Sequence, residues 1–376
     1  MGMKDKRFEF ETVIRDTVNL CNMDKEKKAI MNLVLDGKKI LLFGRRNTGK
    51  TSLVESFVIP QWLKKNKSGL YVQVDLYGVR SLTHISQRIA LGFSEGFSRA
   101  FKAKSAFQSL IKLIASLRPR MTLDNDGMPR IELSTSEGKP PHFKDIFQKI
   151  NEIHLNDIPA LIVMDEFQDI AGIDEAEGLL RDSLQRLAAT IPVIILGSKK
   201  HLLSRVFSVP KAPLYNWGES VEITPIEYRE YTGFMKERGL NIDLDVSTYL
   251  QDCMKRIPEP INIVCYHLLK KAGVKKISLK MVDENINEIV QNRRGRPQEF
   301  LSTLTYSQAR FLEALGKHEV IKKITAKQVQ WETRLTGPGI LKIVAHFQDM
   351  GVIDKSDKGY EIADPFLELH LRRYGI

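Results

Sequence analysis

The stretch that decides the fold of this chain reads Gly44-Arg45-Arg46-Asn47-Thr48-Gly49-Lys50-Thr51-Ser52. It fits the pattern G-x-x-x-x-G-K-[ST] of a phosphate-binding loop, in which glycine lets successive backbone amides turn toward phosphate oxygens. A helix that starts directly after such a loop adds about half a positive charge at its N-terminus. We expect the whole stretch to bind nucleotide. Lys50 would neutralise the β- and γ-phosphates during binding and catalysis, and Thr51 would offer its hydroxyl to Mg²⁺.

The residues on both sides of the loop fit this motif. Residues 38–43 end in an apolar run typical of a buried parallel strand. Residues 51–65 place their apolar side chains at helical spacing. A strand, a glycine loop and a helix start are the context that the motif requires. The alternative, a chance glycine turn before a helix, leaves the match of both flanks unexplained.

A second motif supplies carboxylates. Residues 159–164 form an apolar run that ends in Asp165 and Glu166. A strand buried on both faces exposes acids only at its end, which is the sheet edge where ligands bind in open α/β folds. We expect Asp165 to hold the Mg²⁺ shell, usually through water, and Glu166 to polarise the attacking water. The alternative is a solvated strand end that starts an acidic helix.

Further apolar runs predict the rest of a parallel sheet. Residues 69–75 supply a strand between the two motifs, and this inserted strand, with a Glu after the metal-binding Asp, indicates the ATPase division of these folds. Residues 220–224 predict a fifth strand. Residues 191–196 lead to Ser198, which would lie beside the γ-phosphate as a sensor, with Lys199 as the next candidate. An ordinary strand end is the alternative reading of Ser198.

Length and composition limit the classes of protein to which this chain can belong. A chain of 376 residues predicts two or three domains, and 43% hydrophobic with 27% charged residues is ordinary for a soluble protein. No apolar run approaches the roughly 18 residues of a membrane span, and the first residues lack the apolar core of a signal peptide. The three cysteines form no C-x-x-C pair, so neither zinc nor disulfides are indicated. We therefore expect a cytoplasmic protein without a membrane partner.

The net charge of +11 suggests an anionic partner, and part of it would serve the nucleotide. Residues 1–150 carry +12, whereas residues 301–376 hold eleven Lys and Arg against nine Asp and Glu. The most basic local run is Arg293-Arg294-Gly295-Arg296. It could contact phosphates, but a solvated linker is the interpretation we favour.

The periodicities divide the chain into three predicted domains. Residues 1–225 would form the ATPase core, with a helix in the first 37 residues beside the loop and an inserted hairpin at about 118–134. Residues 226–300 read as a helical lid. Residues 301–376 predict three helices and two short strands, the pattern of a winged helix. Its third helix offers few polar side chains to base edges, so packing against the protein itself or a partner is favoured over DNA contact.

The two motifs, with residues 71–75, 196–198 and the C-terminal stretches 351–353 and 359–366, resemble the archaeal-type P-loop ATPase family. That family is related to STAND signalling ATPases and to origin-recognition AAA+ proteins. The resemblance implies an AAA+-like core, a helical lid and a C-terminal winged helix.

Two departures from the family pattern concern arginine. Members often carry Gly-Arg after a Pro-Leu-Tyr element, whereas here Pro213-Leu214-Tyr215 is followed by Asn216-Trp217. The family's lid often has a glycine-rich turn before a proline, whereas this chain has Arg256-Ile257-Pro258-Glu259-Pro260 there, and Arg256 is a candidate lid charge. Without a clear arginine finger, which contributes roughly 10³–10⁵ in rate, turnover would be slow or dependent on a partner.

The sequence thus predicts an ATP-hydrolysing conformational switch that uses ATP, ADP and Mg²⁺ and acts on a protein partner or by self-association. One alternative is a DNA-associated ATPase of the origin-recognition kind. Another is a nucleotide-binding module that does not hydrolyse ATP. The sequence identifies neither the partner, nor the pathway, nor the oligomeric state.

Overall fold

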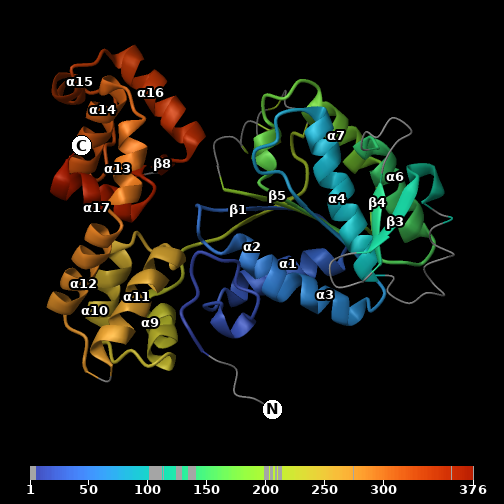
Figure 1. Ribbon diagram of the computed structural model, residues 1–376, viewed down its shortest axis with the longest axis horizontal. Helices are drawn as coiled ribbons and strands as arrows, with labels where there is room; N and C mark the ends of the chain where they lie inside the picture. The colour runs from blue at the N-terminus through green and yellow to red at the C-terminus, as the bar shows by residue number, and fades with distance from the viewer. Residues whose placement is uncertain are drawn as a thin grey trace. The chain divides into compact units, whose positions relative to one another are not determined.

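The computed structural model describes residues 6–100, 112, 114–123, 129–133, 141–198, 203, 206–207, 210, 214–273, 275–356 and 358–375. These residues form two compact units, seen in Figure 1. The sheet unit comprises Met23–Arg45 and Lys50–Thr224. The helical unit comprises residues 6–22, Arg46–Gly49 and residues 225–375.

A five-stranded parallel sheet organises the sheet unit. Its strands lie in the order β2 (Leu70–Asp75), β5 (Ala160–Asp165), β6 (Val193–Gly197), β1 (Lys39–Phe43) and β7 (Glu219–Glu222). The three inner strands are buried over nearly their whole length, which is why they read as continuous apolar runs. The predicted α/β fold with a parallel sheet is confirmed.

The strand expected over residues 69–75, between the two motifs along the chain, is confirmed as β2. In the sheet, β2 is an edge strand beside β5. Strand β6 is the one that separates β1 from β5. The crossover that follows a parallel strand can carry the chain past a neighbour, so order along the chain does not dictate order in the sheet.

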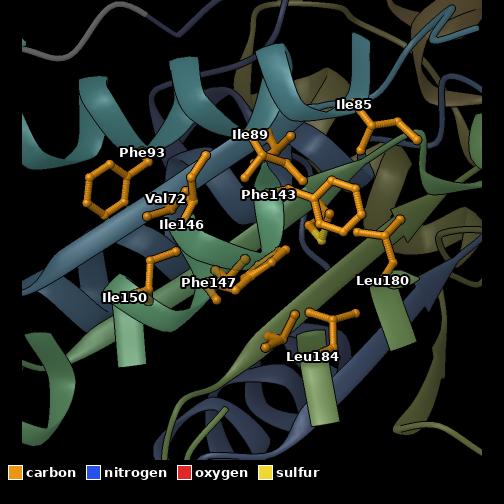
Figure 2. Packing of buried hydrophobic residues seen from close by; sticks show 14 of the residues in the cluster. Val72, Ile85, Ile89, Phe93, Phe143, Ile146, Phe147, Ile150, Leu180 and Leu184 are labelled. Atoms are coloured by element: carbon orange, nitrogen blue, oxygen red, sulfur yellow. The ribbon is translucent and has the colours of Figure 1, made fainter. Parts of the chain in front are cut away.

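Helices cover both faces of the sheet (Figure 1). One face carries helix α1 (Asp24–Leu35) and the segment that follows the phosphate-binding loop. This segment consists of α2 (Lys50–Leu53), a π-helical turn (Val54–Val58) and α3 (Ile59–Lys65). The other face carries α4 (Leu82–Ala100), α6 (Phe143–Leu155) and α7 (Ala176–Gln185). Figure 2 shows the core that these three helices form against the sheet, rich in phenylalanine and isoleucine.

Helix α4 lies unusually close to strand β2. A Cβ atom added at Gly92 or Gly96 would collide with the carbonyl oxygen of Gln73 or Tyr71, respectively. Glycine at these two positions lets the helix backbone approach the strand directly. Of the helix expected over residues 80–118, α4 ends at Ala100 and Ala115–Leu117 form a 3₁₀ turn, while residues 101–111 lie outside the described part.

An antiparallel pair of strands, β3 (Pro119–Leu123) and β4 (Pro129–Leu133), lies where the hairpin is expected. The turn at residues 124–128 is outside the described residues. Strand β4 packs against α4, so the hairpin extends the α4 side of the unit.

The helical unit begins with helices at the expected lid positions. They are α9 (Tyr228–Glu237), α10 (Leu244–Cys253), α11 (Pro258–Ala272), α12 (Leu279–Asn292) and α13 (Gly295–Ser302). The C-terminal segment follows, with α14 (Tyr306–His318), α15 (Lys327–Thr333), α16 (Gly337–Met350), β8 (Ile353–Ser356), β9 (Gly359–Ile362) and α17 (Pro365–Tyr374). Strands β8 and β9 are antiparallel, and this segment has its own apolar core. Helix α17 was not expected from the sequence.

Residues 6–22, which we call the N-terminal strap, belong to the helical unit. Buried Arg238, the residue that directly follows α9, donates hydrogen bonds to the carbonyl oxygens of Arg7 (3.1 Å) and Val18. Asn262 of α11 donates to the carbonyl oxygen of Glu9 (2.7 Å). These hydrogen bonds join the strap to two helices of the helical unit. The strap carries backbone acceptors that the two helices satisfy, and residue periodicity does not report such pairings.

The favoured interpretation of residues 293–296 as a solvated linker is also wrong. Helix α13 begins at Gly295, and the side chains of Arg293 and Arg296 both donate to Glu11 of the strap. The Arg294 guanidinium lies over the ring of Tyr374, 4.8 Å from its centre. Arg293 and Arg296 thus share one carboxylate acceptor, and Arg294 packs on an aromatic ring. In the described residues, no helix is long and apolar enough to cross a bilayer.

Candidate functional site

The register of the parallel sheet brings the two motifs to one edge. Phe43, the last residue of β1, pairs with Gly197 of β6, and Asp165 of β5 pairs with Asp75 of β2. Because all the strands are parallel, their carboxyl ends lie at the same edge, which is where ligands bind in such sheets. This edge therefore carries the start of the phosphate-binding loop, the acids Asp165 and Glu166 at the end of β5, and Ser198 directly after β6.

The phosphate-binding loop has the backbone that its glycines predict. Gly49 has φ +87° and Asn47 has φ +61°, both in the left-handed region. Lys50 is only 7% exposed, and its Nζ donates to the carbonyl oxygens of Gly44 (2.9 Å) and Arg45 (2.7 Å). The loop carbonyls thus hold the ammonium group at the base of the loop. Arg46 and Asn47 are exposed, whereas Thr48 and Ser52 are buried.

The loop helix and the acidic strand are joined directly. Thr51 Oγ1 donates to Asp165 Oδ2 (2.7 Å) across 114 positions of sequence, and the Glu166 amide donates to Asp165 Oδ1 (2.8 Å). Burial nevertheless raises the pKa of Asp165, outweighing the hydrogen bond from Thr51 that lowers it. A buried carboxylate with a raised pKa gains more from a bound cation than an exposed one would.

Thr51 and Asp165 fit a Mg²⁺ ion that takes its remaining ligands from phosphate oxygens and water. Among the residues that the structure describes, no group of three or more His, Cys, Asp or Glu could hold a metal by itself.

Glu166 is held by two side chains. Its backbone is left-handed, with φ +49°. Ser198 Oγ donates to Glu166 Oε2 (2.9 Å), and Gln168 Nε2 donates to the same oxygen. The sequence did not point to Gln168, which is 1% exposed at the start of a 3₁₀ turn. Gln168 lies between Phe167 and Ile170, both of which are buried. Helical periodicity in the sequence does not distinguish a buried polar residue at such a position from an exposed one.

Two other candidates have different outcomes. Lys199 lies outside the described residues. Arg256 donates to the Ile226 carbonyl oxygen (2.7 Å), and its guanidinium lies over the Tyr228 ring, 4.2 Å from the centre. Both contacts lie within the helical unit.

Comparison with solved structures identifies the fold. The Walker-type ATPase paby2304 of Pyrococcus abyssi aligns over 97% of this chain and 99% of its own, with 17% identity and a TM-score of 0.64. The ORC2 protein of Aeropyrum pernix, in its ADPNP–ADP complexes, aligns over 97% and 96%, with 13% identity and a TM-score of 0.56. The ADP form of the same protein has a TM-score of 0.50 at 12% identity, over 97% and 96%.

Neither a protein-family model nor a curated protein sequence matches this chain. Alignment over nearly the whole of both chains means that the likeness covers both units and extends beyond the sheet. At these identities the likeness concerns the fold. This chain therefore has the fold shared by the Walker-type ATPase paby2304 of Pyrococcus abyssi and the ORC2 protein of Aeropyrum pernix.

Proposed function

We propose that this protein binds ATP with Mg²⁺, hydrolyses it, and changes conformation between its nucleotide states. The observation that carries the proposal is the hydrogen bond from Thr51 to Asp165, supported by the one from Ser198 to Glu166. The sequence assigned these four residues to three roles and placed them after three different strands, and the structure brings them together as two interacting pairs. The full-length likeness to a Walker-type ATPase supports the same conclusion.

The roles follow from chemistry. Lys50 and the loop amides hold the phosphates, and Thr51 with Asp165 holds Mg²⁺. When bound, Mg²⁺ neutralises charge that develops on the phosphate oxygens. Glu166 accepts a proton from the attacking water. Ser198 and Gln168 orient the carboxylate by donating to one of its oxygens, which leaves the other available to water.

The test separates binding from chemistry. Glu166→Gln should bind ATP as the parent does and lose turnover, because an amide cannot accept the proton of water. Asp174→Asn is the matched control, since it removes an exposed acid from the loop after the same strand. Lys50→Ala should lose nucleotide binding. Calorimetric titration and phosphate release measure both steps, and parental turnover in Glu166→Gln would contradict the assigned chemistry.

We further propose that residues 1–225 are the ATPase core, residues 226–300 its lid, and residues 301–376 a winged helix that contacts protein. Three large apolar side chains of the C-terminal segment are exposed: Trp331 (82%), Leu341 (51%) and Met350 (41%). Leu341 and Met350 lie on α16, the helix that would read DNA in a winged helix. Exposed apolar groups at that position favour a protein partner or a second copy over base edges.

The DNA-associated alternative is tested on the same helix. The double substitution Lys342→Ala with His346→Ala removes the exposed basic groups of α16. We expect it to leave the affinity of the full chain for duplex DNA unchanged in fluorescence anisotropy at two salt concentrations. Non-specific binding of about 10⁻⁴–10⁻⁶ M that weakens with salt is expected from the basic chain alone. Sequence-selective binding lost in the variant would favour the DNA-associated function.

A further inference from the structure

The loop that follows strand β2 is attached to the acidic segment that ends strand β5. The amide of Leu76, the first residue after β2, donates to the carbonyl oxygen of Asp165 (3.0 Å). Further along this loop, the amide of Gly78 donates to Asp169 Oδ2 (2.9 Å). Both strands belong to the sheet unit, so these contacts lie within one compact unit. The loop is thereby joined to residues 165–169 at two points.

The local sequence fixes the direction of the Gly78 amide. Tyr77 donates its amide to Asp75 Oδ1 (2.9 Å), which is an Asx turn formed by the last residue of β2. Gly78 has φ +67°, a conformation that glycine adopts without steric cost. Val79, the next residue, is 5% exposed and anchors the loop in the core. The turn and this anchor therefore hold the Gly78 amide in place.

The other oxygen of Asp169 accepts from the side chain of Gln168. Gln168 Nε2 donates to Asp169 Oδ1 (3.3 Å) and to Glu166 Oε2. An ionised carboxylate only accepts hydrogen bonds, so the two acids allow one orientation of this amide, with its nitrogen toward both of them. The amide nitrogen has two N–H groups, one for each carboxylate. Gln168 therefore links Asp169 to the carboxylate that we propose as the acceptor of the proton from water.

The amide oxygen of Gln168 shows what this orientation costs. Gln168 is 1% exposed, and no donor among the described residues reaches its Oε1. This oxygen lies against Gly197, where an added Cβ atom would come within 2.6 Å of it. A buried acceptor without a partner is unfavourable, so the amide keeps this orientation only because its nitrogen is held. Two carboxylates hold it, and Glu166 by itself supplies only one of them.

We propose that Asp169 is a positioning residue for Glu166 and that it acts through the Gln168 amide. The inference rests on the proposed hydrolysis and assigns a role in it to the loop after β2, whose amide fixes Asp169. With Asp169 in place, Gln168 presents its nitrogen to Glu166 Oε2, and Oε1 stays available to the attacking water. When the Asp169 carboxylate is lost, the amide can turn and place its oxygen against the Glu166 carboxylate, which the repulsion would displace. The effect falls on the chemical step, because the phosphate-binding loop is unchanged.

Single-turnover hydrolysis of Mg·ATP by the full chain, with calorimetric titration of binding, tests this role. Asp169→Asn leaves one acceptor oxygen where aspartate uses two, so either Gln168 or Gly78 loses its acceptor. We expect the rate of hydrolysis to fall by about tenfold, the equivalent of one charge-assisted hydrogen bond. The Kd for ATP should change less than about twofold. Asp174→Asn, the exposed acid in the loop after the same strand, is the matched control and should change neither quantity.

A second substitution shows whether Asp169 acts through the Gln168 amide. Gln168→Met keeps a flexible side chain of similar length without the amide, and should lower the rate by about tenfold. In this background, Asp169→Asn should lower the rate by less than about twofold more, because the amide that it orients is gone. Losses that multiply would mean that the two residues act independently, and would overturn the proposal. Thermal unfolding establishes that each variant is folded, and Asp169→Ala, which removes both acceptors, replaces Asp169→Asn if that variant does not fold.

The outcomes distinguish this inference from the proposed function. Parental hydrolysis in Glu166→Gln, or a parent that hydrolyses no ATP, would overturn the proposed function and this inference with it. If Glu166→Gln abolishes hydrolysis while Asp169→Asn hydrolyses ATP as the parent does, the proposed function stands and the positioning role is wrong. If Asp169→Asn weakens ATP binding as much as it slows hydrolysis, Asp169 maintains the structure of the site, and the positioning role is again wrong.

Discussion

Replacing Thr51 with alanine should destabilise the sheet unit, and the cost can be worked out from one hydrogen bond. Thr51 Oγ1 lies 2.7 Å from a carboxylate oxygen of Asp165, a group whose pKa is raised by burial. A hydrogen bond to a charged group contributes about 1.5–3 kcal/mol. Alanine is the better helix former by about 0.5 kcal/mol, which offsets part of the loss. We expect a net decrease of about 1–2.5 kcal/mol in the free energy of unfolding.

Urea denaturation followed by tryptophan fluorescence measures this change. Trp62, in α3 of the sheet unit, is 3% exposed and reports the loss of packing there. Thr51→Ser keeps the hydroxyl and should retain most of the parental stability. In an Asp165→Asn background the cost of Thr51→Ala should shrink, because a hydrogen bond to a neutral amide contributes only about 0.5–1.5 kcal/mol. Equal destabilisation by serine and alanine, or an unchanged cost beside asparagine, would refute the reasoning.

Three further predictions concern particular contacts. Asp165→Asn should stabilise the nucleotide-free protein at neutral pH. Burial raises the pKa of Asp165 in the folded protein above 3.8, so ionising this carboxyl group at neutral pH costs stability. The stability advantage of the variant should therefore vanish as the pH falls toward 3.8. Thermal unfolding at a series of pH values measures this dependence. Gly92→Ala should destabilise by about 1–3 kcal/mol because its Cβ would collide with the Gln73 carbonyl oxygen, whereas Gly178→Ala, in open space on α7, should stabilise by about 0.5–1 kcal/mol; a gain at both positions in urea denaturation would contradict the packing of α4. Lys255→Met should destabilise the helical unit by about 3–5 kcal/mol, because the carboxylates of Glu361 (14% exposed) and Glu368 (7% exposed) would lose their shared cation. An unchanged midpoint of thermal unfolding would show that these ion pairs do not stabilise the unit.

The sequence by itself determined the fold class and the residue types of the site. The phosphate-binding loop is recognisable because its dihedral requirements are local, as the left-handed backbone of Gly49 illustrates. The buried strands are recognisable because burial on both faces demands continuous apolar runs. Asp165, at the end of such a run, was placed at the carboxyl edge by that argument alone, and the register of the sheet agrees with it.

Tertiary structure alone decided how distant segments meet. Strand β6 lies between β1 and β5, and this order follows from crossovers that no residue pattern records. Gln168 holds Glu166, and Glu11 meets Arg293 across a sequence separation of 282 positions. Pairings of this kind depend on complementary donors and acceptors across large sequence separations, whereas periodicity reports only the exposure of a residue relative to its neighbours. Arg293 and Arg296 looked like part of a linker in the sequence because their acceptor, Glu11, is far away along the chain, near its N-terminus.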